Sequence, residues 1–277
     1  MIYISAMKSS KEKSLAAKII GTMESLTHAE KALETTKLIL EDEEIQIAQE
    51  FANNVSLVRL GYNDHGPVHM YTVALNVIIM LDLLRQADIK TSIEKEGVGS
   101  FDDSLIAVIF ASMLHDLGMC VGRHDHELHS VYTAVPIIDR ILSVVYPKNM
   151  QKKIMIRSVA LEGISGHMGN RSISSLEAGV VQVADGCDMT KGRARISMAL
   201  NHSPRVGSIH QYSANSIEKV RITKGQEKPI QIEVLMSSEV GLFQIEEVLL
   251  TKIASSTAKP YIELITQVQE NEPIRYL

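Results

Sequence analysis

Histidine residues are unevenly spread along this chain, and their positions indicate where chemistry takes place. The 277-residue sequence contains ten histidines. Those between residues 65 and 167 are His65, His69, His115, His124, His126, His129 and His167. Imidazole and carboxylate ligands together suit divalent ions such as Mn, Fe, Co, Ni or Zn, whereas Mg and Ca prefer oxygen ligands alone. The histidine-rich stretch therefore predicts a site for a divalent transition metal.

Two His-Asp dipeptides lie within this stretch, and their surroundings distinguish them. His115-Asp116 follows the apolar run LIAVIFASML, whereas His124-Asp125 lies in a polar segment. A charged Asp and a His at the end of a buried helix are costly to remove from water unless a metal or another partner satisfies them. We therefore expect His115 and Asp116 to be functional, and His124 and Asp125 to be solvated.

Two helices are predicted to position the first of these residues. Pro is favoured at the first position of a helix, so DHGP at 64–67 predicts a helix that extends to about residue 84 with His69 in its first turn. The capping box SFDD at 100–103 precedes the apolar run and predicts a helix that ends at the His115-Asp116 doublet. Both helices would be largely buried.

Three further helices are predicted between the doublet and residue 190. Helices over about 127–145 and 147–162 are followed by the glycine-flanked loop GISGHMGN, which holds His167. The sequence SSLE at 174–177 reads as another capping box and predicts a helix that runs to Asp185 and Asp188. The ends of several helices would then bring histidines and aspartates together.

With these residues placed, the sequence resembles the HD-domain metal-dependent phosphohydrolases. The signature of that family is a His on one helix, a His-Asp doublet ending a second helix and a final Asp on a later one. The matching residues are His69 in HGPVHMYTVA, His115 and Asp116 in ASMLHDLGM, and Asp185 in VVQVADGCDM. The resemblance covers about residues 61–199 and implies a helical bundle in which these four side chains bind the metal.

The resemblance also implies a second metal ion. Family members with two metals carry further histidines between the doublet and the last Asp, and His126 and His167 stand in matching places. The implied cofactor is one or two divalent transition ions per chain, with Asp116 bridging two ions. The branch that cleaves cyclic di-GMP carries a GYP signature and paired histidines at the later position, whereas Met168 follows His167 here. Cleavage of cyclic di-GMP is therefore not expected.

Residues near the expected ligands are candidates for catalysis and substrate binding. Asp188 lies three residues beyond Asp185 on the same helical face, where its carboxylate can orient a water or a ligand histidine. His65 is, with Asp188, a candidate for proton transfer, or else it makes local hydrogen bonds at the start of its helix. Lys191 and Arg193 are candidates for binding a phosphate, or else they form a solvated helix end.

The fold is expected to be mainly α with a small C-terminal α+β module. Helical spacing over 11–53 predicts two or three amphipathic helices. After residue 213 the runs IEKVRITK, PIQIEVLM, GLFQIEEVLLTKIAS and YIELITQV predict the order β-β-α-β. We expect N-terminal helices over 1–60, an HD-type helical domain over 61–205 and the module over 213–277. The apolar strands of the module are compatible with a homodimer.

Composition narrows the expected partners and compartment. With 28 basic and 33 acidic residues, a net charge of −5, 4% aromatic residues and no Trp, no nucleic-acid polymer is expected as a partner. The two cysteines, Cys120 and Cys187, cannot form a disulfide framework, which favours the cytoplasm. Uninterrupted apolar runs such as 105–114 are shorter than the roughly 20 residues that span a bilayer, so no membrane partner is expected.

Together these features predict a metal-dependent phosphohydrolase. A divalent ion lowers the pKa of a bound water from near 16 towards about 7 and polarises a phosphoryl oxygen. Asp116 would be central because it holds the ion, and the expected substrate is a phosphate ester of a nucleotide or a related small molecule. Two alternatives stay open: a diiron oxygenase, because a His-rich variant of this scaffold resembles mixed-valent oxygenases, and a non-catalytic sensor that binds a metal or nucleotide.

Overall fold

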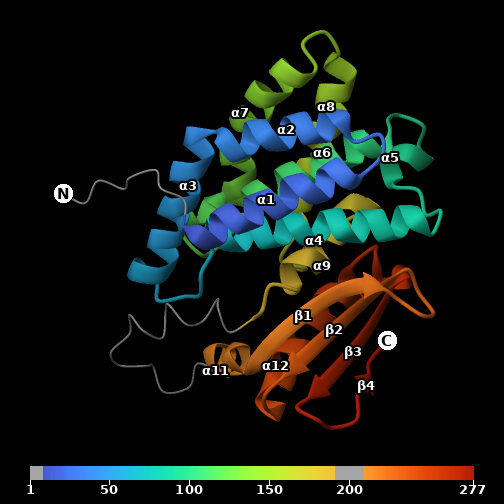
Figure 1. Cartoon of the computed structure of the whole chain (residues 1–277). Helices are drawn as coiled ribbons and strands as arrows, with labels where there is room; N and C mark the ends of the chain where they lie inside the picture. The colour runs from blue at the N-terminus through green and yellow to red at the C-terminus, as the bar shows by residue number, and fades with distance from the viewer. Residues whose placement is uncertain (1–8, 191–208) are drawn as a thin grey trace.

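The computed structural model describes residues 9–190 and 209–277 of the chain. Figure 1 shows a helical body above a smaller C-terminal module built on a four-stranded sheet. The expectation of a mainly α protein with a small α+β module is therefore confirmed. The expected phosphate ligands Lys191 and Arg193 lie outside the described residues.

Three amphipathic helices open the chain, as the spacing predicts. They are α1 (Ser10–Ser25), α2 (Glu30–Glu41) and α3 (Glu43–Asn54). The Ser9 and Asp42 side chains cap α1 and α3 by accepting hydrogen bonds from backbone N–H groups of the first turn. The buried faces of α1 and α2 pack on the central helices α4 (Pro67–Gln86) and α6 (Phe101–Leu114). A short helix, α5 (Ser92–Lys95), joins these two central helices.

Helix α6 is the centre of the helical body. Its predicted capping box is present, because Ser100 and Asp103 exchange side-chain hydrogen bonds with each other's backbone N–H. Nearly all of its residues are buried because α2, α4, α8 (Met150–Gly166) and α9 (Leu176–Gly186) surround it. The helix ends at Leu114, so that His115 and Asp116 follow directly at a buried end.

A short 3-10 helix, Leu117–Cys120, brings the chain close to the start of α7 (His126–Val145). A Cβ added at Gly118 would lie 2.0 Å from the His126 carbonyl oxygen and 2.5 Å from the Ser130 backbone nitrogen. The Gly118 N–H donates to the Ser130 hydroxyl at 2.8 Å. Glycine is therefore required here by the close approach of two backbones, which fixes where α7 begins.

The last two helices of the body differ in detail from the sequence expectation. Helix α8 continues to Gly166, beyond the expected end near residue 162, so His167 follows the helix directly and does not lie within a loop. Helix α9 is capped by Ser175, whose hydroxyl accepts from the Ala178 N–H at 3.1 Å.

The predicted capping box at 174–177 is therefore wrong in its residues. The Glu177 carboxylate accepts from the backbone N–H groups of Ser92 and Ile93, each at 3.1 Å. It caps α5 from a neighbouring helix because that N-terminus has unsatisfied donors packed against α9. A tertiary contact thus replaces the local one that the pattern predicts.

The C-terminal module follows the predicted order, with one short strand added. Its elements are α11 (Ile209–Ser216), β1 (Ile217–Lys224), β2 (Ile230–Met236), α12 (Leu242–Gln244), α13 (Leu250–Ser255), β3 (Ile262–Val268) and β4 (Ile274–Arg275). The sheet order is β1-β2-β3-β4. The β1/β2 and β3/β4 pairs are antiparallel, whereas β2 and β3 run parallel and need the helical crossover between them. Alternate residues of β2 are buried, so one face of the sheet is covered.

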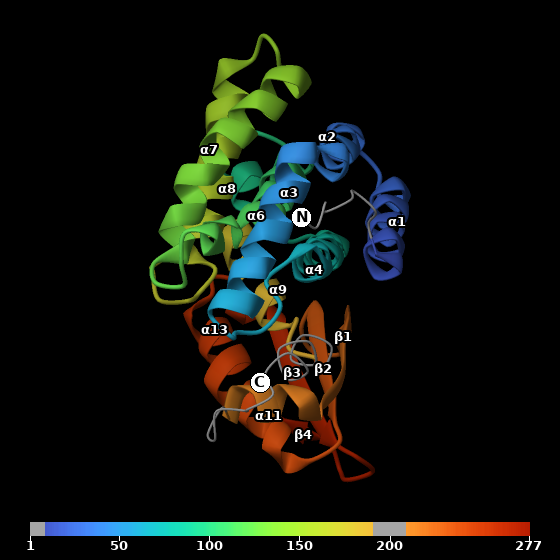
Figure 2. The same ribbon diagram turned by 90° about the vertical axis from the view of Figure 1, so that its left-hand side faces the viewer.

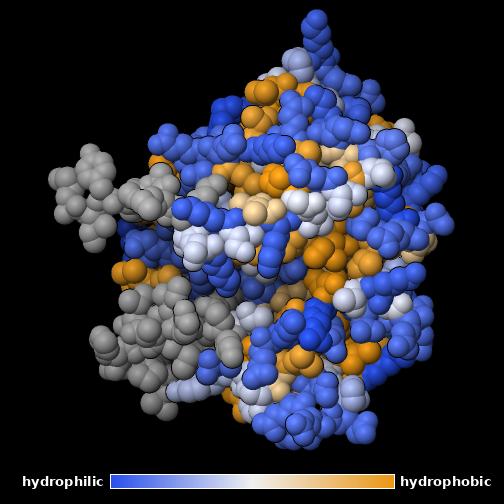
Figure 3. Space-filling model, in the orientation of Figure 1, coloured by the Kyte–Doolittle hydropathy of each residue, from blue (hydrophilic) through white to orange (hydrophobic). Residues whose placement is uncertain are grey.

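The module packs against the body through α9 and α4. Figures 1 and 2 both place α9 at the junction, and Figure 3 shows apolar side chains where α4 meets the module. A Cβ at Gly179 would lie 2.1 Å from the Thr257 hydroxyl oxygen, so the loop after α13 approaches the backbone of α9 closely. The Ser256 hydroxyl donates to the Gly179 carbonyl at 2.9 Å. The two parts of the chain therefore share an interface beside the ends of the central helices.

Three helical segments are long and apolar enough to cross a membrane by length and composition: Pro67–Gln86, Phe101–Cys120 and His126–Val145. These segments are longer than the uninterrupted apolar runs of the sequence because weakly polar residues are included in them. The most apolar 18-residue stretches of these three segments are 67%, 94% and 39% buried inside the protein, respectively. Packing within the chain accounts for most of the apolar character of the first two.

Candidate metal centre

Six predicted ligands come together because each stands at or near the end of a helix. His69 is in the first turn of α4, His126 is the first residue of α7, and Asp185 is in the last turn of α9. His115 and His167 follow the last residues of α6 and α8. All are buried: His69, His115, Asp116, His126, His167 and Asp185 are exposed by 5% or less.

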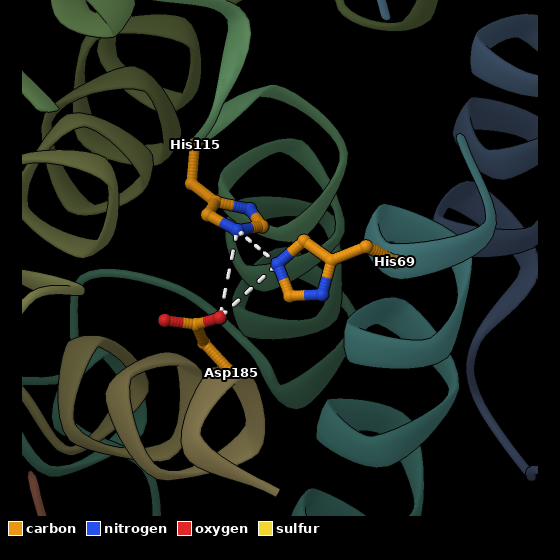
Figure 4. A group of neighbouring side chains, drawn as sticks. All are labelled: His69, His115 and Asp185. Atoms are coloured by element: carbon orange, nitrogen blue, oxygen red, sulfur yellow. Dashed lines mark hydrogen bonds and ion pairs between the residues drawn. The ribbon is translucent and has the colours of Figure 1, made fainter. Parts of the chain in front are cut away.

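The first half of the cluster joins α4, α6 and α9 (Figure 4). His69 Nε2 lies 3.1 Å from His115 Nε2 and 3.1 Å from Asp185 Oδ1. His115 Nε2 lies 3.8 Å from the same Asp185 oxygen. Asp116 Oδ2 lies 3.4 Å from each of the two imidazole nitrogens. The ligand atoms of His69, His115 and Asp185 all lie within 4.8 Å of one another, a spacing that could hold a metal ion, and those of His115, Asp116 and His167 form a second such group.

The second half of the cluster joins α7 and α8. His126 Nε2 lies 3.1 Å from His167 Nε2. Asp116 Oδ1, the other oxygen of the shared carboxylate, lies 3.2 Å from His126 Nε2 and 3.6 Å from His167 Nε2. Asp116 thus directs Oδ2 to His69 and His115 and Oδ1 to His126 and His167.

The outer nitrogens of the four histidines are held by acceptors. The partners of Nδ1 are Asp188 Oδ2 for His69 (2.7 Å), the Ser112 carbonyl for His115 (2.9 Å), the Arg123 carbonyl for His126 (3.0 Å) and the Ile164 carbonyl for His167 (2.7 Å). Each carbonyl belongs to the residue three positions earlier. An acceptor at Nδ1 places the proton there and leaves the Nε2 lone pair facing the centre, as metal-binding histidines require.

This arrangement fits a cation. The facing Nε2 atoms of His69 and His115, and those of His126 and His167, would direct lone pairs at each other in their neutral forms. Asp116 Oδ2 is buried and accepts no hydrogen bond from any residue that the structure describes. Buried acceptors that converge in this way are costly unless a positive charge satisfies them, so the residues present fit a divalent cation.

The protonation states support the same conclusion. Burial acts to raise the pKa of Asp116, but electrostatic and hydrogen-bonding interactions with the neighbouring imidazoles, His115 foremost, hold it well below its ordinary value. Burial likewise opposes ionisation of Asp185, yet Lys252 and His69 keep the pKa of this carboxyl well below its usual range. Burial lowers the pKa of His167 to about 4. Near neutral pH the carboxylates are charged and His167 is neutral, which are the forms that bind metals.

Two of the candidates for proton transfer adjoin the cluster. Helix α9 ends at Gly186, so the expectation that Asp188 continues the helical face of Asp185 is wrong. Its carboxylate nevertheless accepts from His69 Nδ1 and orients that ring, one of the two roles expected for it. The His65 ring contacts the His69 ring edge-on, with 6.1 Å between the ring centroids. Its Nδ1 is 2.6 Å from the Asn63 carbonyl oxygen, so the local hydrogen bonds considered for His65 are present. His124 is exposed in the polar loop, as expected.

The sequence analysis missed two basic residues beside the centre. Lys252, on α13 of the C-terminal module, is buried and forms an ion pair and hydrogen bond with Asp185 Oδ2. Arg123 Nη1 lies 3.4 Å from His126 Nε2, and its guanidinium carbon lies 5.8 Å from the centroid of the Tyr62 ring. Lys252 lies in an ordinary amphipathic helix, where nothing in the local sequence indicates a functional role. Arg123 lies between the two His-Asp dipeptides, and this position could have indicated that it is near the site.

Comparison with known proteins gives two matches of different strength. The chain is 41% identical over 236 residues to the uncharacterized protein MJ1020 of Methanocaldococcus jannaschii, covering 85% of this chain and 89% of that protein. It is 24% identical over 170 residues to ribonuclease Y of Clostridium novyi, covering 60% of this chain and 31% of that protein. No family model and no solved structure matches the sequence.

Proposed function

We propose that this chain, which belongs to the family of the MJ1020 protein of Methanocaldococcus jannaschii, is a metal-dependent phosphohydrolase. Its substrate would be a phosphate ester of a nucleotide or a related small molecule. The observation that carries the proposal is the division of Asp116 between two groups of histidine ligands, with Oδ1 directed to one and Oδ2 to the other. Paired divalent ions stabilise both the attacking and the leaving oxygen of a phosphoryl transfer.

The roles of the residues follow from their contacts. Bound divalent ions would supply an acidified water and a positive charge for the phosphoryl oxygens. Asp188 orients His69, which keeps the Nε2 lone pair directed into the centre. Because His65 donates from Nδ1 to a carbonyl, its Nε2 is the basic nitrogen of the ring, and we assign it to accept a proton during the reaction.

Binding of the phosphate needs cations besides the metal. Arg123 is half-buried and stands beside the His126 ligand, where its planar guanidinium suits two phosphoryl oxygens. Lys191 and Arg193, which lie outside the described residues, are also proposed to bind the phosphate. The contact of Arg123 with the Tyr62 ring leaves an aromatic surface at the same place, suited to an apolar or aromatic part of a substrate.

A second candidate substrate is RNA. The similarity to ribonuclease Y, a protein named for acting on RNA, favours a phosphodiester over a phosphomonoester. The net charge of −5 opposes it, because affinity for a polynucleotide depends mainly on contacts between cations and phosphates. A single-stranded oligoribonucleotide therefore belongs in the substrate panel beside nucleotides and small phosphate esters.

The test is hydrolysis by the metal-loaded protein, compared with two Asp variants. Asp116→Ala should lose both bound metal and hydrolysis. Asp125→Asn, in the exposed His-Asp dipeptide, should keep both. A wild-type rate in the Asp116 variant would overturn the assignment. No turnover on any phosphate ester at full metal content, with oxygen uptake by the iron-loaded protein, would favour the diiron oxygenase; tight nucleotide binding without turnover would favour the sensor.

A further inference from the structure

Lys252 is unusual among the described lysines because its charge is buried beside the candidate metal centre. The residue is 7% exposed, and its ammonium is paired with Asp185 Oδ2. The other oxygen of that carboxylate, Oδ1, lies 3.1 Å from His69 Nε2. A residue of the C-terminal module therefore reaches the edge of the centre through a carboxylate that belongs to the helical body.

Two glycines pack against the aliphatic stem of Lys252 where it extends toward Asp185. A Cβ at Gly186 would lie 3.1 Å from Lys252 Cδ, and a Cβ at Gly169 would lie 3.7 Å from Lys252 Cγ. Gly169 has a φ of +80°, which favours glycine, and follows the ligand His167 by two residues. The stem thus lies against both glycines, and at Gly186 a side chain would crowd it.

The hydrogen-bonding capacity of the ammonium is only partly used. A lysine ammonium has three N–H donors and no acceptor. Within residues 9–190 and 209–277, the Lys252 Nζ makes one hydrogen bond, to Asp185 Oδ2. A buried cation with unused donors is costly to retain unless another acceptor satisfies it at some stage of function.

We propose that Lys252 binds a phosphoryl oxygen of the substrate, so that the C-terminal module completes the active site. This inference rests on the proposed phosphohydrolase function. One N–H of the ammonium continues to donate to Asp185 Oδ2, which keeps Oδ1 of that carboxylate directed to His69. The remaining donors bind a non-bridging oxygen of a phosphate held at the His69, His115 and Asp185 half of the centre.

The position of Lys252 complements that of Arg123. Arg123 adjoins His126 in the second half of the centre, whereas Lys252 adjoins Asp185 in the first. A cation of the chain therefore adjoins a candidate ligand in each half of the centre. The α+β module would then be a component of the site, supplying a residue that the helical body does not hold at that position.

The experiment compares phosphate binding by the metal-loaded wild-type protein and its Lys252→Met variant. Inorganic phosphate is titrated by calorimetry, and the metal content of each sample is measured by elemental mass spectrometry. We expect the variant to keep its metal and to bind phosphate at least about tenfold more weakly, because charge-assisted hydrogen bonds are strong. Lys252→Arg keeps the charge and should recover part of the affinity.

A matched control removes a different lysine from a buried carboxylate. Lys152 pairs with Asp103 at 2.8 Å, remote in sequence from the ligands, and Lys152→Met should lose stability without changing phosphate affinity. If Lys252→Met does not fold, Lys252→Gln, which keeps a donor for Asp185, takes its place in the same comparison.

The outcomes separate the two levels of the proposal. Wild-type affinity for phosphate in the Lys252 variant would overturn the inference and leave the proposed function intact. Loss of metal from that variant at saturating concentrations would also overturn it, because Lys252 would then act on the metal through Asp185. Absence of phosphate binding by the fully loaded wild-type protein would instead refute the proposed function itself.

Discussion

Replacement of Asp188 tests whether the histidines of the centre are oriented for metal binding. The Asp188 carboxylate accepts the Nδ1–H of His69 at 2.7 Å, and both side chains are largely buried. Loss of such a partner frees the imidazole to rotate or to change tautomer, which typically weakens metal affinity by about 10–100-fold. That factor corresponds to about 1.4–2.8 kcal/mol, since each factor of ten is about 1.4 kcal/mol at room temperature.

The assay is competition for Mn or Zn with a chromophoric chelator, which resolves the two halves of the centre as separate affinities. Asp188→Ala should weaken the half that contains His69 by the stated factor and leave the half that contains His126 and His167 within about threefold. Asp188→Asn keeps an acceptor oxygen for Nδ1 and should lose less affinity than Ala. Equal affinities in wild type and Asp188→Ala would refute the argument that this carboxylate positions a metal ligand.

Further predictions concern the frame that holds the centre. Gly118→Ala should reduce occupancy at the second half of the centre, seen as loss of about one ion per chain, because the new Cβ would meet the His126 carbonyl at 2.0 Å; unchanged occupancy would contradict this. Glu177→Ala should lower the free energy of unfolding by about 2 kcal/mol in denaturant titrations without changing metal content, because the backbone N–H groups of Ser92 and Ile93 and the Ser104 hydroxyl lose their acceptor. The pKa of Asp103 is lowered because, although burial opposes ionisation, Lys152 and other donors stabilise the carboxylate. Its contribution to stability is present above the ordinary Asp pKa and is lost as the pH falls through the lower native value, so Asp103→Asn should be less stable than wild type at pH 7, with the difference shrinking below about pH 4.

The sequence predicted the candidate site well where local signals place residues at helix ends. Pro67 begins α4 two residues before His69, and the Ser100 cap and an apolar run bring α6 to an end at His115. Because the ends of packed helices converge, placing the ligands on these ends was sufficient to predict that they meet.

The remaining features depend on tertiary contacts that no local pattern contains. Glu177 was expected to cap its own helix, but it caps α5, because the packing of α5 against α9 brings unsatisfied N–H groups within its reach. Lys252 lies on an ordinary amphipathic helix, and only the docking of the C-terminal module on α9 brings its ammonium to Asp185. The order of strands and helices in that module was predictable, whereas its position against the centre was not.

The most direct test of the account is the metal content of the purified chain, measured by elemental mass spectrometry on protein prepared without added metal or chelator. The arrangement of Asp116 between His69 and His115 on one side and His126 and His167 on the other predicts about two transition-metal ions per chain. Absence of bound metal, even after reconstitution with Mn, Fe, Co, Ni and Zn, would contradict the central claim that these side chains form a metal centre.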